Sequence, residues 1–73
     1  MLEEVPDGTR VGRYLLLRDV DGRRHALLAT AVHAASQEED GDTMLLLPGG
    51  RALRVSVPFA NVLGWLEGKA EQP

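Results

Sequence analysis

RYLLLR (residues 13–18) and TMLLL (residues 43–47) decide the fold of this chain. Side chains alternate between the two faces of a β-strand, so a strand that is apolar on both faces needs cover on both sides. The sequence contains one convincing helix, near the C-terminus. One short helix covers one face of a small sheet. The second face therefore has to close into a barrel or meet another surface.

Three turn signals connect these runs to neighbouring strands. Asp21-Gly22 follows the first run, Asp40-Gly41 precedes the second, and Pro48-Gly49-Gly50 follows it. Such dipeptides supply the backbone angles of tight hairpins. Beyond the last turn, one side of the next strand is apolar: Leu53, Val55 and Val57. We expect an antiparallel sheet of four or five strands, joined by hairpins, over residues 11–57.

The segment from Arg24 to Gln37 is compatible with two structures. Its alanines and leucines favour a helix at residues 24–36. The preceding turn and the alternation along the segment favour two short strands, near 23–29 and 31–37, with a kink around Thr30. We predict the two strands. The helix remains the alternative, because a short apolar run does not distinguish the 3.6-residue period of a helix from the two-residue period of a strand.

Residues 58–68 are predicted to form an amphipathic helix packed on one face of the sheet. Pro58 suits the first helical position, where its missing N–H costs nothing, and Gly68 suits the C-cap. The predicted apolar stripe consists of Phe59, Val62, Leu63 and Leu66, with Trp65 at its edge. Residues 1–10 are expected to be a loose arm and residues 69–73 to fray. The chain is thus predicted to be a single α+β domain.

Composition excludes several classes of protein. The 73 residues are 44% hydrophobic, which supports a folded core and argues against disorder. A chain of this size buries only roughly 60% of its unfolded surface, so the core is marginal. There is no cysteine, no apolar leader and no run long enough for a membrane span. We expect a cytoplasmic protein with no membrane partner.

Motifs that would indicate catalysis are absent from the sequence. No serine lies in a G-x-S-x-G elbow, and no glycine pattern matches a phosphate-binding loop. His25 and His33 lie eight residues apart without a cysteine to complete a zinc site. We therefore predict no enzyme activity, no metal and no cofactor.

Charge distribution points to a binding protein. The net charge of −3 argues against non-specific nucleic-acid binding. Seven of the eight cations are arginine, which suits bidentate recognition of carboxylates or phosphates. The same bias is typical of chains encoded by GC-rich genomes. The acids gather at residues 38–42, either as a solvated loop or as a surface for a basic partner. The predicted partner-binding residues are Arg18, Arg23, Arg24, Arg51, Arg54, Glu38, Glu39, Asp40 and Asp42.

Two families resemble this chain. The pattern of Leu15-Leu16-Leu17, Asp21-Gly22 and D-T-x-L-x-L-x-G-G at residues 42–50 looks like a family of small flagellar regulatory proteins, over about residues 14–66. The whole-chain size, the arginine bias and the sheet-plus-helix plan resemble the small RNA polymerase-binding transcription regulators of lytic phages. That second resemblance carries no diagnostic motif, so it assigns no functional residue.

The polymerase resemblance implies a protein that binds host RNA polymerase, inhibits initiation and promotes antitermination in the host cytoplasm. The arginines would then also make weak phosphate contacts with nucleic acid held by the polymerase. The flagellar resemblance implies a homodimeric adaptor, and a small nucleic-acid-binding domain is a further alternative. We expect the polymerase-binding regulator.

Overall fold

The computed structural model describes residues 6–67 of the chain. Its fold class is α+β, as the sequence predicts. The elements, in chain order, are β1 (Arg10–Val11), β2 (Tyr14–Arg18), β3 (Arg24–Leu28), a 3-10 turn (Ala29–Ala31), β4 (Ala34–Gln37), β5 (Thr43–Leu47), a second 3-10 turn (Pro48–Gly50), β6 (Arg51–Val55) and α1 (Phe59–Glu67).

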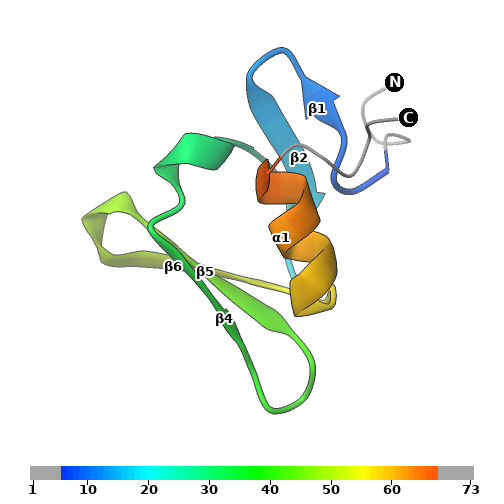
Figure 1. Ribbon diagram of the computed structural model, residues 1–73, viewed down its shortest axis with the longest axis vertical. Coiled ribbons are helices and arrows are strands. Elements are labelled where there is room, and N and C mark those ends of the chain that lie inside the picture. Colours follow the sequence, from blue (N-terminus) through cyan, green and yellow to red (C-terminus); the bar gives the residue numbers. More distant parts are fainter. Residues whose placement is uncertain (1–5, 68–73) are drawn as a thin grey trace.

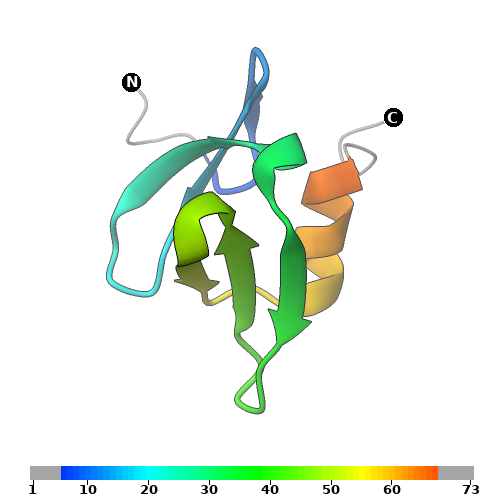
Figure 2. The same ribbon diagram turned by 90° about the vertical axis from the view of Figure 1, so that its left-hand side faces the viewer.

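The strands of the described residues form two antiparallel sheets of three strands each, so the prediction of a single sheet is wrong. Sheet A has the order β1-β2-β3 and sheet B the order β4-β5-β6. The two sheets lie against each other, with α1 at one side (Figures 1 and 2). The chain divides in this way because the 3-10 turn at Ala29–Ala31 redirects it between β3 and β4.

The segment from Arg24 to Gln37 forms strands β3 and β4, so the two-strand prediction is confirmed and the helical alternative is wrong. The expected kink at Thr30 lies in the 3-10 turn. Leu27 of β3 lies opposite Leu15, and Ala35 of β4 lies opposite Leu45. Pairing with these buried leucines decides the structure of a segment whose helical propensity is high.

All three predicted hairpin turns are confirmed. The turn after β2 contains Gly22 at a φ of 88°, a conformation that favours glycine. The acidic segment joins β4 to β5, and Pro48–Gly50 joins β5 to β6. The alternation along β6 is confirmed as well, since Leu53 and Val55 are buried while Ala52 is exposed.

One apolar core lies between the sheets and receives side chains from both of them. Its buried members are Leu15, Leu17, Leu45, Leu53, Val55 and Val62. Thr43 is buried beside them, and its hydroxyl donates a hydrogen bond to the carbonyl oxygen of Val57 at 2.7 Å. The inner faces of β2, β5 and β6 therefore cover one another.

The expected loose arm is ordered over residues 6–10, which corrects that prediction. The amide of Gly8 donates to the carbonyl oxygen of Leu16 at 2.7 Å, and the amide of Leu16 donates to the carbonyl oxygen of Thr9 at 2.9 Å. Arg10 begins β1 opposite Leu15. The predicted Gly68 cap, the fraying of residues 69–73 and the structure of residues 1–5 lie outside the described residues.

Helix α1 packs beside β4 and the first 3-10 turn and closes one side of the core (Figure 1). It begins at Phe59, one residue later than predicted, and the Pro58 carbonyl accepts from the amide of Val62 at 3.1 Å. Leu63 is 38% exposed, so its place in the buried stripe is wrong. Trp65 packs on the core instead, because Gly8 leaves room for its indole.

Candidate functional site

The face of sheet A that points away from the core is mostly apolar and partly exposed. Leu15 and Leu17 of β2 point into the core, so the residues that alternate with them point outward. Their cross-strand partners share this side of the sheet. The sheet A outer face consists of Val11, Tyr14, Leu16, Arg18, Arg24, Ala26 and Leu28.

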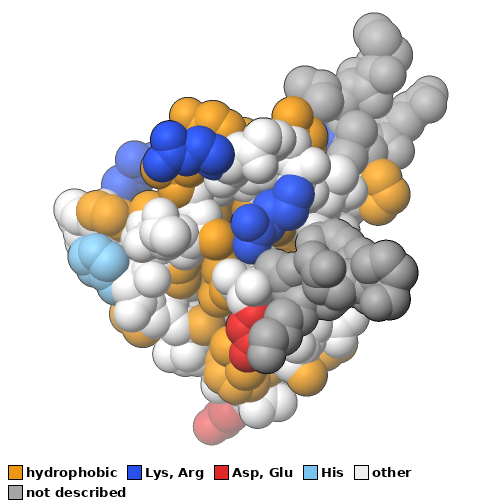
Figure 3. Space-filling view, turned by 45° about the horizontal axis from the view of Figure 1, so that its top comes forward, with side chains coloured by type: hydrophobic (Ala, Val, Ile, Leu, Met, Phe, Trp, Pro, Cys, Tyr) orange, Lys and Arg blue, Asp and Glu red, His pale blue; other side chains and the backbone are white. Residues whose placement is uncertain are grey.

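Large apolar side chains reach solvent on this surface. Tyr14 is 50% exposed and Val11, directly opposite it, is 47% exposed. Leu16 and Leu28 are half-buried and continue the apolar surface along β2 and β3. In the view of Figure 3, basic side chains lie beside hydrophobic ones in the upper part, with the acidic side chains lower down. Since large exposed apolar patches mark interaction sites, this face is a candidate interaction surface.

Two of the predicted partner-binding arginines meet on the sheet A outer face. Arg18 lies directly opposite Arg24 at the hairpin end of β2 and β3. Like charges on directly opposed residues of an antiparallel pair destabilise the sheet. An anionic group of a partner would lower that repulsion.

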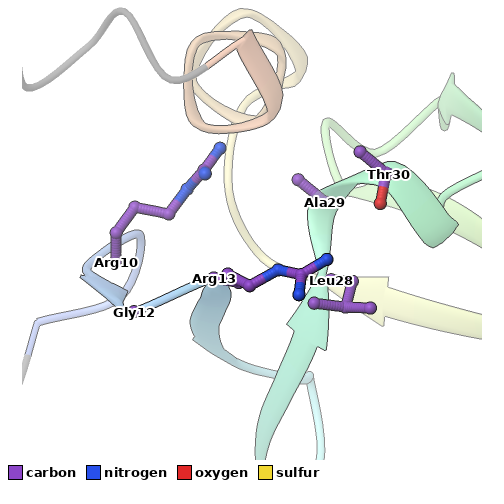
Figure 4. Close-up of a pocket in the computed structure, with 6 residues that line it drawn as sticks. All are labelled: Arg10, Gly12, Arg13, Leu28, Ala29 and Thr30. Atoms are coloured by element: carbon purple, nitrogen blue, oxygen red, sulfur yellow. The ribbon is translucent and has the colours of Figure 1, made fainter.

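A hollow of about 310 Å³ lies at the other end of sheet A (Figure 4). Arg10, Arg13 and Thr30 are its polar lining, and Leu28 connects it to the sheet A outer face. The Nη2 atom of Arg10 donates to the carbonyl oxygen of Trp65 at 2.6 Å, near the C-terminus of α1. The buried Nε atom of Arg10 has no hydrogen-bond partner among the described residues. Two guanidinium groups and a hydroxyl suit a carboxylate or a phosphate.

Sequence reasoning did not select Arg10 or Arg13 as site residues. Their sequence neighbourhoods do not distinguish these two arginines from the other arginines of the chain. Arg10 is recognised only from the folded structure, because its hydrogen-bond partner lies in α1, more than fifty residues away in the sequence.

The predicted acidic residues and Arg54 pair with each other within the chain. The Arg54 guanidinium contacts Asp40 at 2.7 Å and Asp42 at 3.0 Å. The amide of Asp42, followed by the guanidinium of Arg54, holds the pKa of Asp40 below its usual 3.8. Glu38 and Glu39 line a hollow of about 380 Å³ beside Asp40 and Arg54. Arg54, one of the predicted partner-binding residues, therefore already has anionic partners within the chain.

The two remaining predicted arginines are exposed at turns. Arg23 lies in the turn between β2 and β3, and its amide donates to Oδ1 of Asp19 at 3.0 Å. Arg51 is the first residue of β6 and shares a hollow with His25. The hydrogen bond between Nε2 of His25 and Oδ2 of Asp19 spans 2.8 Å and is the largest cause of a lowered pKa at Asp19.

Within residues 6–67, no three or more acidic or histidine side chains are grouped in a way that would hold a metal ion. The described part of the chain also contains no helix of the length and apolarity needed to cross a membrane. Comparison of the chain with protein-family models, curated proteins and solved structures finds no match.

Proposed function

We propose that this chain is a small regulator of transcription that acts by binding a protein, and that the protein is bacterial RNA polymerase. The supporting observation is the sheet A outer face, where Tyr14 and Val11 are about half exposed and arginines lie at both ends. Aromatic and arginine side chains are enriched at the energetic centres of protein interfaces. The polymerase is the partner implied by the phage-regulator resemblance.

The size of the chain limits how it can bind. A stable interface takes about 800 Å² from each partner. The described residues measure 30 × 24 × 24 Å, so such an interface occupies most of one side of the molecule. The sheet A outer face and the arginine hollow at its end together supply one continuous side.

In the proposed mode of action, the apolar residues supply affinity and the arginines supply orientation. Arg10 and Arg13 would meet a carboxylate of the polymerase or a phosphate of nucleic acid held by it. Bound in this way, the chain would inhibit initiation and promote antitermination in the cytoplasm of a bacterial host. A homodimeric adaptor or a nucleic-acid-binding domain would use the same surfaces differently, and the following experiment separates them.

The test is a titration of purified RNA polymerase, as core enzyme and holoenzyme, into fluorescently labelled chain. Replacing Tyr14 by alanine is expected to raise the dissociation constant about tenfold or more. Leu46→Ala is the matched control, because Leu46 is 41% exposed on the outer face of sheet B, and binding should change less than about threefold.

Three outcomes contradict the proposal. The polymerase fails to bind the wild-type chain, or the two variants weaken binding equally, or the chain binds nucleic acid alone with a steep salt dependence. Sedimentation at twice the chain mass, lost in Tyr14→Ala, would assign the same surface to a homodimer.

A further inference from the structure

The outer edge of β3 carries main-chain groups that no strand within residues 6–67 pairs with. β3 is the last strand in the order of sheet A, and it pairs with β2. On its other side, β2 pairs with β1 and bonds to the preceding residues Gly8 and Thr9. An open strand edge is a template for another strand.

The hydrogen-bond pattern identifies which residues face this edge. The amide and carbonyl of Leu16 point toward β1, because they bond to Thr9 and Gly8. Main-chain groups alternate in direction along an antiparallel strand, so those of Leu15 and Leu17 point toward β3. Their partners there are Leu27 and His25.

A second bond confirms this alternation. The amide of Asp19 donates to the carbonyl oxygen of Arg23 at 2.9 Å, so Arg23, His25 and Leu27 share the direction toward β2. The main-chain groups of Ala26 and Leu28 consequently point away from the sheet, toward the open edge. Ala26 is exposed, and its small side chain leaves this edge accessible.

A hollow of about 270 Å³ runs along this edge. One wall is formed by His25, Ala26 and Leu27, and the facing wall by Leu47, Pro48 and Arg51 at the turn between β5 and β6. At one end the sheets are joined, because the amide of Val20 donates to the carbonyl oxygen of Arg54 at 2.9 Å. From that point β3 and the β5–β6 turn bound an open groove, and Figure 2 shows β3 at the margin of the molecule.

The charge around the groove is positive. Arg51 lies on the facing wall, and Arg24 lines an adjoining hollow with Leu16, His25 and Ala26. Among residues 6–67, no carboxylate lines either hollow. His25, which lines both hollows, is hydrogen-bonded to Asp19 at 2.8 Å. An extended segment with acidic side chains therefore complements both the shape and the charge.

We infer that the partner protein contributes an extended acidic segment, which adds to β3 as a fourth strand of sheet A. This inference rests on the proposed protein-binding function and specifies how the partner engages. Main-chain hydrogen bonds to Ala26 and Leu28 supply affinity, and Arg51 on the facing wall selects acidic side chains. The groove is continuous with the sheet A outer face, since Ala26 belongs to both.

The first experiment uses the full chain, labelled with ¹⁵N, and a short acetylated peptide of alternating valine and glutamate as the probe. Amide exchange at Ala26 and Leu28 is expected to slow about tenfold at saturating peptide, while Leu27, which already bonds to β2, stays unchanged. The matched peptide with lysine in place of glutamate should leave all three unchanged. Equal effects of both peptides, or protection only at another strand, would overturn the inference.

The second experiment uses variants at one position. Ala26→Pro removes the edge N–H without removing a bond to β2, so peptide binding should weaken about tenfold. Ala26→Val keeps the N–H and favours a strand, so binding should stay within about threefold. Urea unfolding of both variants checks that each is folded, and equal binding by two folded variants contradicts strand addition.

The polymerase titration separates the two proposals. If Tyr14→Ala weakens polymerase binding and Ala26→Pro does not, the proposed function stands and strand addition is wrong. If the acidic peptide protects Ala26 while polymerase does not bind, the proposed partner is wrong and strand addition stands. A dimer of this chain that Ala26→Pro abolishes would assign the edge to a second copy and overturn the acidic segment as its occupant.

Discussion

Gly8 shows at the scale of one residue how the N-terminal segment is held. Its φ is 91°, and a Cβ atom at this position would overlap the indole of Trp65. Gly8→Ala is therefore expected to lower the free energy of unfolding by about 2–4 kcal/mol, from backbone strain and overpacking together. Gly12→Ala is the control, because Gly12 has a φ of 60° but open space around it, and should cost about 1 kcal/mol. Equal losses in urea unfolding would contradict the Trp65 contact.

Asp19 makes stability depend on pH. It accepts hydrogen bonds from His25 and from the amides of Asp21 and Arg23, which hold its pKa below the usual 3.8. The ionised carboxylate therefore stabilises the fold above pH 3.8, and this contribution is lost as the pH falls through the lower pKa of the folded state. Asp19→Asn should be less stable than wild type at about pH 7, and the difference should shrink toward about pH 2. If the difference in unfolding free energy between Asp19→Asn and wild type stays constant over this pH range, Asp19 is not the source of the pH dependence.

At the scale of the element, β5 tests the assignment of inner and outer faces. Leu45 is fully buried and its neighbour Leu46 is 41% exposed. Leu45→Ala should cost about 3 kcal/mol, enough to unfold a large share of a marginal domain. Leu46→Ala should cost about 1 kcal/mol or less. Denaturant midpoints that rank the two variants in the opposite order would contradict the register of β5.

The elements were predictable where local chemistry determines them. The Asp-Gly turns and the Pro48-Gly49-Gly50 turn define the hairpins, and the alternation of Leu53 and Val55 defines β6. The rotation of α1 was not predictable, because periodicity allows either Leu63 or Trp65 to face the core. Gly8 selects Trp65, and that contact joins residues far apart in the chain.

At the scale of the whole molecule, the division into two sheets and most of the candidate site depend on long-range contacts. The turn at Ala29–Ala31 sends β3 and β4 into different sheets. The sequence predicted a kink near Thr30 but did not show that the kink separates the two strands into different sheets. Because two strands are apolar on both faces, the sequence did predict that one helix would leave part of the apolar sheet surface uncovered. It could not show that Arg54 pairs with Asp40, or that Arg18 faces Arg24 across sheet A.

Hydrogen–deuterium exchange of the chain, free and bound to RNA polymerase, tests the central claim most directly. Docking through sheet A predicts slower exchange on binding at residues 11–18 and 24–28, with β4 and β6 unchanged. Protection confined to residues 34–37 and 51–55, or no protection at saturating polymerase, would contradict it.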